Sequence, residues 1–144
     1  MATRAIEFSA DGRELYWLDS RGRDTAAAVA HDLESGTMRI LAEDPRADFT
    51  HLLLDPITER PVAAARTFER ARWEVLDPDY EQDFNYLTRQ SSGDLMITSM
   101  SQDRRHWIVA YLHDNLWITS ITIATRGRLG VSFRRCPHWR ARRL

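Results

Sequence analysis

A polar turn followed by a short alternating strand is the feature that most constrains this fold. Residues 8–24 read FSADGRELYWLDSRGRD, in which Asp11 and Gly12 form a turn and residues 14–19 form a strand. An aspartate can bond the backbone of its own turn, and glycine adopts positive φ at no steric cost. The same S-x-D-x-R pattern returns at residues 101–105, before another aromatic strand. This repetition predicts antiparallel β-sheet.

The rest of the chain continues the pattern. We expect strands at 5–8, 14–19, 25–33, 37–42, 49–55, 61–66, 72–77, 95–100 and 106–111. Residues 25–33 contain four alanines, so helix is the competing prediction there, although the turns on both sides favour strand. Pro61 is allowed only at the first position of its strand. The segment LLLDPITERP is a weaker version of the repeated turn.

One helix interrupts the strands, at about 78–90. Asp77 is the predicted N-cap and Pro78 the first helical residue. Tyr80, Phe84 and Leu87 follow helical spacing and form one apolar stripe. The spacing of the strands favours a propeller over a sandwich. We therefore expect an all-β fold of antiparallel sheets, a partial β-propeller of two to three blades with one short helix.

The residues from FSADGRELYWLDSRGRDTAAAVAHDLESG to SQDRRHWIVAY resemble part of the β-propeller of prolyl oligopeptidase-family serine peptidases, in the bacterial dipeptidyl-aminopeptidase and acylaminoacyl-peptidase-like branch. The resemblance covers about residues 5–115. It implies a propeller that screens access to an α/β-hydrolase domain with a Ser-Asp-His triad. It also implies peptide hydrolysis by a full-length relative and peptide substrates as its partners.

No catalytic motif is carried over to this chain. Its six glycines do not form the G-x-S-x-G elbow of such hydrolases. A blade takes roughly 40–45 residues and a closed ring about four blades or more, so we expect a fragment truncated at both ends. We predict no catalytic, cofactor-binding or metal-binding residue and no cofactor, and therefore a chain that is inactive alone.

Several residue pairs and possible nucleophiles could be given catalytic or metal-binding roles, but each has a simpler structural explanation. His31-Asp32 and His113-Asp114 lie at predicted strand ends, where neighbours point to opposite faces. The other histidines lack ligand spacing. The serines lack a nucleophile elbow, the arginines fit turns, and the tryptophans fit core packing. These remaining candidates are His51, His106, His138, Ser20, Ser99, Ser101, Cys136, Arg21, Arg23, Arg104, Arg105, Trp17, Trp73 and Trp107.

Charge divides the chain into two predicted parts. Residues 1–115 carry 13 arginines and 21 acidic residues, a net charge of −8, whereas residues 116–144 carry seven arginines and no acid. We expect a partial propeller at 1–115 and a basic tail at 116–144. The single cysteine excludes an internal disulfide framework. Without a signal peptide or membrane-length apolar run, we expect a cytoplasmic protein with no membrane partner.

The alternative function is a stand-alone β-rich module that binds a peptide or protein and carries a basic C-terminal tail. Arginines in that tail could contact phosphates, but no nucleic-acid motif frames them, and we expect no nucleic-acid partner. For the fragment we expect self-association through exposed sheet edges.

The tail generates a prediction about the gene. Read from the third base of each codon, residues 116–126 permit VDYFYHYRDP, the acidic, tyrosine-rich strand expected after YLHDN. Trp117 followed by Ile118 forces Asp in that frame, and His138 followed by Trp139 forces Leu. We expect resequencing to show a frameshift near codon 116 and a G-x-S-x-G-containing frame downstream. An intact single frame running into an unrelated region would contradict this origin.

Overall fold

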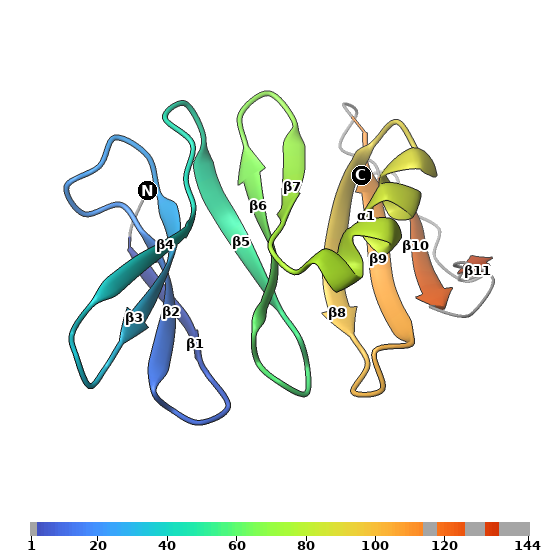
Figure 1. Cartoon of the computed structure of the whole chain (residues 1–144). Helices are drawn as coiled ribbons and strands as arrows, with labels where there is room; N and C mark the ends of the chain where they lie inside the picture. Colours follow the sequence, from blue (N-terminus) through green and yellow to red (C-terminus); the bar gives the residue numbers. More distant parts are fainter. Residues whose placement is uncertain (1–2, 114–117, 126–131, 136–144) are drawn as a thin grey trace, which may run out of the picture. The chain divides into compact units, whose positions relative to one another are not determined.

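The computed structural model describes residues 3–113, 118–125 and 132–135. The chain divides into two compact units, Met1–Pro78 and Asp79–Leu144. Three small antiparallel sheets follow one another along the chain, with one short helix before the third (Figure 1). None of the described sheets closes into a barrel. The predicted all-β class, of the kind expected for part of a propeller, is confirmed.

The first unit begins with a four-stranded sheet made of successive hairpins. Its strands are β1 (Arg4–Phe8), β2 (Glu14–Asp19), β3 (Ala27–Asp32) and β4 (Met38–Ala42), paired in that order. The strand predicted at 25–33 is confirmed and the competing helix is wrong. Local alanine propensity is outweighed here because β3 pairs with strands on both sides and its alanines are buried.

A three-stranded sheet completes the first unit. It consists of β5 (Asp48–Leu54), β6 (Pro61–Thr67) and β7 (Ala71–Val75). Pro61 stands at the first position of its strand, as predicted, where its missing N–H costs least. The predicted strands at 49–55, 61–66 and 72–77 are all present, with ends shifted by one or two residues.

The core of the first unit lies between its two sheets. Leu18, Ala28 and Ala42 of the first sheet pack against Phe49 and Ala64 of the second, and all five are at most 4% exposed. Alanine side chains let the two sheets approach closely, and the phenyl ring of Phe49 fills the space that remains. Hydrophobic burial at this seam is therefore what joins the two sheets into one unit.

A 3-10 turn, η1 (Pro78–Tyr80), runs from the last residue of the first unit into the second, where the helix α1 (Glu81–Arg89) follows. A sheet follows in the order β11-β10-β9-β8. Its strands are β8 (Asp94–Met100), β9 (His106–Leu112), β10 (Ile118–Thr125) and β11 (Ser132–Arg135). The last two strands fall in the predicted tail. The predicted boundary at 115/116 lies outside the described residues and stays a prediction.

The helix packs on one tryptophan of the sheet. The Trp107 ring lies 5.9 Å from that of Tyr80 and 5.8 Å from that of Phe84, between ring centroids. The Tyr111 hydroxyl donates to the Leu87 carbonyl at 2.7 Å. The predicted stripe of Tyr80, Phe84 and Leu87 is buried, as expected.

The start of the helix differs from the prediction. Asp77 and Pro78 do not begin the α-helix, because a 3-10 turn comes first and Tyr80 occupies the α-helical N-cap. The fixed φ of Pro78 is compatible with either kind of turn. The chain forms the tighter 3-10 turn here, and Tyr80 at the end of this turn is buried beside Trp107.

The two S-x-D-x-R sequences form the same turn. In the first, the Ser9 hydroxyl donates to Asp11 at 2.7 Å and accepts the Glu14 N–H at 2.9 Å, and Asp11 also accepts the Arg13 N–H at 3.1 Å. Gly12 has φ of 70°. The repeat of turn-forming residues in the sequence therefore corresponds to a network of specific side-chain bonds to the backbone.

The second S-x-D-x-R turn reproduces each bond of the first. Ser101 donates to Asp103 at 2.5 Å and accepts the His106 N–H at 2.9 Å, and Asp103 accepts the Arg105 N–H at 3.0 Å. Arg104 stands where the first turn has glycine, at φ of 61°. The two hairpins, one in each unit, are thus built on one local design.

The weaker repeat LLLDPITERP is a different turn, so its assignment to the same series is wrong. Asp55 lacks the preceding serine, and its carboxylate accepts the N–H groups of Ile57 and Thr58 at 2.9 and 2.8 Å. Asp32, between β3 and β4, accepts those of Glu34 and Ser35 at 3.0 and 2.8 Å. LLLDPITERP therefore forms the same type of turn as AHDLESGT.

The position of positive φ in this second turn type yields a stability prediction. Gly36 has φ of 71° in one turn, and Glu59 has φ of 53° at the matching place in the other. A side chain at positive φ costs about 1–2 kcal/mol, and the extra freedom of unfolded glycine about 0.5–1. Glu59→Gly should therefore raise the free energy of unfolding, measured in urea, by about 0.5–1 kcal/mol.

Gly36→Ala is the matched reverse change. A Cβ at Gly36 would meet no atom within 4 Å, so its effect reports backbone conformation alone. We expect a loss of about 1 kcal/mol. Destabilisation by Glu59→Gly would show that the Glu59 side chain contributes more than its backbone costs.

The paired serine turns yield a prediction about pH. The pKa of Asp11 is lowered from 3.8 chiefly by the Ser9 hydrogen bond, and that of Asp103 by the Ser101 bond. A lowered pKa means that each ionised carboxylate stabilises the fold above pH 3.8, and that this contribution is lost as the pH falls below it. Ser9→Ala should raise the pKa of Asp11 and leave Asp103 unchanged, as followed by carbon NMR titration of the carboxylates.

Ser101→Ala should do the opposite, so each turn serves as the control for the other. If one substitution moved both pKa values equally, a change in global stability and not the local bond would be the cause.

Candidate functional site

The first unit carries an open groove of about 910 Å³. Three hairpin turns border it, at residues 9–13, 32–37 and 55–60, together with the segment that follows β7. Its apolar lining comes from Leu41, Pro61, Leu76 and neighbouring small residues. The charged residues that line it are Asp11, Arg13, Glu14, Asp32, Arg39, Arg60 and Asp77.

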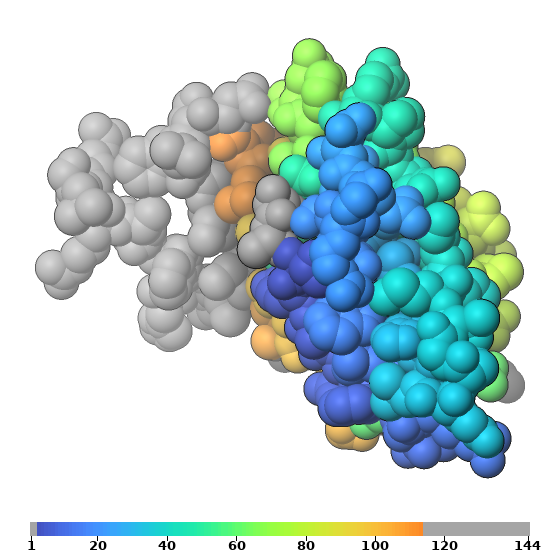
Figure 2. All heavy atoms as spheres, turned by 90° about the vertical axis from the view of Figure 1, so that its left-hand side faces the viewer, coloured from blue at the N-terminus to red at the C-terminus, as the bar shows by residue number. Residues whose placement is uncertain are grey.

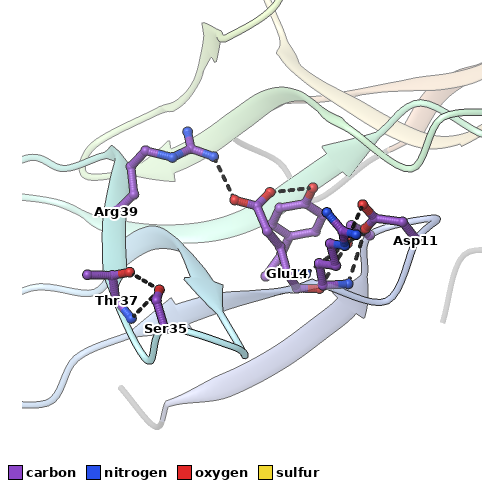
Figure 3. A network of polar contacts seen from close by, with 8 residues as sticks. Asp11, Glu14, Ser35, Thr37 and Arg39 are labelled. Atoms are coloured by element: carbon purple, nitrogen blue, oxygen red, sulfur yellow. Dashed lines mark hydrogen bonds and ion pairs between the residues drawn. The ribbon is translucent and has the colours of Figure 1, made fainter.

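Glu14 lies at the centre of the polar contacts in this groove (Figure 3). Its carboxylate accepts a bond from Arg39 Nη2 at 3.1 Å and from the Tyr16 hydroxyl at 3.3 Å. Glu14 and Tyr16 point the same way because strand neighbours two apart share a face. Arg39 reaches them from β4, which is two strands away in the sheet.

The Tyr16 hydroxyl is a hydrogen-bond donor at neutral pH. Burial, together with the negative charge of Glu14, raises the pKa of Tyr16 to about 12. The side chain is 1% exposed. The single proton of this phenol is donated to Glu14, so Tyr16 positions that carboxylate and cannot act as a base.

The aspartates of the groove are occupied by their own turns. Ser9 and the Arg13 N–H bond Asp11, and the N–H groups of Glu34 and Ser35 bond Asp32. These bonds lower the pKa of both carboxylates. Both are therefore ionised structural acceptors and unsuited to donating a proton in general acid catalysis.

Arg60 is the cation of the groove with most capacity for a ligand. Its guanidinium makes no ion pair with any residue that the structure describes, whereas Arg39 bonds Glu14 and Arg13 lies 3.9 Å from Asp11. The positive charge of Arg60 acts on Tyr16 as well and by itself lowers the pKa of the Tyr16 hydroxyl. An unpaired guanidinium near a buried hydroxyl can hold a carboxylate or a peptide carbonyl.

A smaller pocket of about 260 Å³ lies between the β4–β5 connection and the β6–β7 hairpin. Arg46, Arg66, Arg70 and Arg72 line it. Arg66 forms ion pairs with Asp44 at 3.2 Å and with Glu74 at 3.3 Å. Phe68 beside it is 66% exposed.

The histidines singled out from the sequence lie apart in separate local contacts. His51 Nδ1 is 3.1 Å from the Thr50 hydroxyl, and His106 Nδ1 is 3.8 Å from Asp103. His31 is the last residue but one of β3, before Asp32, which accepts bonds from the following turn. Within the described ranges, no group of three or more His, Cys, Asp or Glu residues could hold a metal ion. Asp114, Cys136 and His138 lie outside those ranges.

One serine–histidine contact was not anticipated from the sequence. The Ser91 hydroxyl and His113 Nε2 are 3.3 Å apart, joining the end of α1 to the end of β9. Ser91 also accepts the Gly93 N–H at 3.1 Å. It follows a helix and precedes a strand, which is the reverse of a strand–turn–helix nucleophile elbow. The contact fits the closure of a loop.

The serines named from the sequence also have local surroundings. Ser101 is bonded within its turn, Ser99 lies on β8, and Ser20 follows β2. The turn arginines are paired with acids: Arg21 holds the buried Asp19 with two bonds of 2.9 Å, and Arg23 bonds Glu43 at 2.6 Å. The Trp107 indole N–H donates to the Arg104 carbonyl at 3.1 Å.

Of the three tryptophans named from the sequence, Trp107 is buried in the second unit, and Trp17 and Trp73 are partly exposed. Sequence reasoning did not single out the groove residues. Period-two spacing could have placed Glu14 and Tyr16 on one face. No local signal brings Arg39 and Arg60 to them.

No helix among the described residues is long and apolar enough to cross a membrane. No protein-family profile matches the chain, and no solved structure matches it significantly.

Two curated relatives are similar to it in sequence. Dipeptidyl aminopeptidase BIII of Pseudoxanthomonas mexicana is 41% identical over 101 residues, which are 70% of this chain and 15% of that protein. Dipeptidyl peptidase family member 6 of Caenorhabditis elegans is 27% identical over 111 residues, 76% of this chain and 15% of that protein. The chain thus spans about 15% of the length of the relatives it matches. Its sequence and its succession of small antiparallel sheets make it a homologue of one segment of the dipeptidyl peptidases.

Proposed function

We propose that the chain is part of the β-propeller of a serine peptidase of the prolyl oligopeptidase family. In this role it screens the access of peptides to a separate catalytic domain. The observation that carries the proposal is the 41% identity to a dipeptidyl aminopeptidase over 101 residues, which are 70% of the chain. Successive antiparallel sheets joined by short turns are the architecture that a propeller requires.

The chemistry of the groove supports contact with peptides and does not support their hydrolysis. Arg60 can donate hydrogen bonds to a peptide carboxylate or carbonyl, and Leu41 with Leu76 offers apolar surface. Asp11 and Asp32 in the groove are ionised turn acceptors, which are unsuited to acid catalysis. A segment with this lining would contribute to substrate passage, with the nucleophile and base supplied elsewhere.

The proposal predicts that the purified chain alone does not hydrolyse dipeptidyl chromogenic substrates. It also predicts that the chain can replace its counterpart in a whole enzyme. Exchanging the 101 aligned residues of dipeptidyl aminopeptidase BIII for those of this chain should leave turnover of such substrates within about tenfold of the parent enzyme. The physical reason is that the segment supplies scaffold and passage, not reacting groups.

A second chimera carrying Phe84→Ala is the control, because it removes a ring that packs on Trp107. It should lose about 3–5 kcal/mol of stability and activity with it. Turnover by the isolated chain that a serine-directed inhibitor blocks would overturn the inactive assignment. A folded but inactive chimera would contradict the structural equivalence of the two segments.

A further inference from the structure

Positive charge gathers around one small pocket of the first unit, which we call the arginine pocket. It lies between the β4–β5 connection and the β6–β7 hairpin, which Figure 2 shows next to each other, in teal and light green, at the top of that unit. Its charged lining consists of Asp44, Arg46, Arg66, Glu69, Arg70 and Arg72. Four arginines and two acids give this lining a net charge of +2. A positive hollow in a segment that is otherwise acidic attracts anions.

Asp44 holds the two sides of the arginine pocket together. One oxygen of its carboxylate accepts the Arg46 N–H at 2.8 Å, and the other lies 3.2 Å from Arg66 Nη1. The Thr25 hydroxyl donates to the Asp44 carbonyl at 2.5 Å. These bonds fix the loop that carries Arg46 against the strand that carries Arg66. The wall of the pocket is therefore formed before any ligand arrives, which lowers the entropic cost of binding.

The register of the hairpin places two arginines opposite each other. Arg66 of β6 pairs directly with Arg72 of β7, and side chains paired in this way share a face of the sheet, where like charges repel. Arg66 is neutralised by its two acidic partners. Among residues 3–113, 118–125 and 132–135, neither Arg72 nor the guanidinium of Arg46 forms an ion pair. The pocket thus offers two guanidiniums that can each bind a carboxylate through parallel N–H bonds.

We propose that the arginine pocket binds an acidic peptide segment, with one carboxylate held by Arg46 and a second by Arg72. Its volume of about 260 Å³ is below the roughly 300–1,000 Å³ of a pocket that encloses a whole small ligand. It therefore suits side chains that protrude from a longer chain. Phe68, which is 66% exposed at the same pocket, offers apolar surface to the methylene groups of those side chains.

The charges of the segment argue against a nucleic acid as the ligand. A nucleic acid brings a phosphate charge with every nucleotide, and residues 1–115 repel it through their net charge of −8. Two carboxylates instead match the net charge of +2 in the lining. The arginine pocket shares no residue with the groove. The proposal therefore does not rest on the proposed function and needs no catalytic domain for its test.

NMR titration of the full chain tests the proposal. The probe is the acetylated, amidated dipeptide Glu-Glu, and the neutral dipeptide Gln-Gln is its matched counterpart. The side-chain Nε–H signals of Arg46 and Arg72 should shift saturably with the first and stay unchanged with the second. Arg46→Gln/Arg72→Gln should weaken binding at least tenfold, because it removes both charge-assisted contacts. Arg46→Lys/Arg72→Lys should bind better than the glutamine variant, because it keeps the charge.

The matched control is Arg89→Gln/Arg105→Gln. It removes the same charge from two exposed arginines of the second unit, so it should bind the acidic dipeptide like the wild type. Arg60→Gln tests the groove separately and should also leave this binding unchanged. Backbone amide spectra should show that all variants keep the fold.

Five outcomes would overturn the proposal. They are the absence of a saturable shift, equal binding of the neutral dipeptide, equal weakening by the control, weakening by Arg60→Gln but not by the pocket variant, and tighter binding of inorganic phosphate than of the acidic dipeptide. The fourth would place the peptide in the groove, and the fifth would indicate a phosphate site.

Discussion

An aspartate carboxylate that accepts backbone N–H groups of its own turn is the interaction on which this architecture depends. Asp11 and Asp103 do this with the help of a serine, and Asp32 and Asp55 do it alone. Each turn fixes the register of a hairpin, and register decides which side chains face the core. The four turns therefore determine the packing of the sheets, and the three turns of the first unit also border the groove.

Close packing of small side chains is the second requirement. Ala28, Ala42 and Ala64 bring the two sheets of the first unit together around Phe49. The same strands hold Glu14, Tyr16 and Arg39 farther along, where the sheets part and the groove opens. Its polar lining and the alanine seam thus belong to one sheet face. The groove lining is a continuation of the core, with longer and more polar side chains in place of alanine.

Local chemistry explains what could be predicted from the sequence. Turn residues and period-two alternation located the nine expected strands, and the stripe of Tyr80, Phe84 and Leu87 located the helix. The errors arose where local signals are degenerate. LLLDPITERP shares only its aspartate and arginine with the serine turns, so its true match, AHDLESGT, required the observed hydrogen bonds. Asp77-Pro78 can start a 3-10 or an α-helical turn, and the packing of Tyr80 on Trp107 accompanies the former.

The sequence by itself determined the all-β class, the hairpin turns and the relation to the dipeptidyl peptidases, because each depends on residues close together in the chain or on their order. Only the tertiary structure decided the groove and the arginine pocket. Glu14 meets Arg39 across 25 residues, and Arg46 and Arg72 line one pocket from a loop and a strand that are far apart in the chain. Such contacts depend on strand order and register in space, which no local pattern of residues specifies.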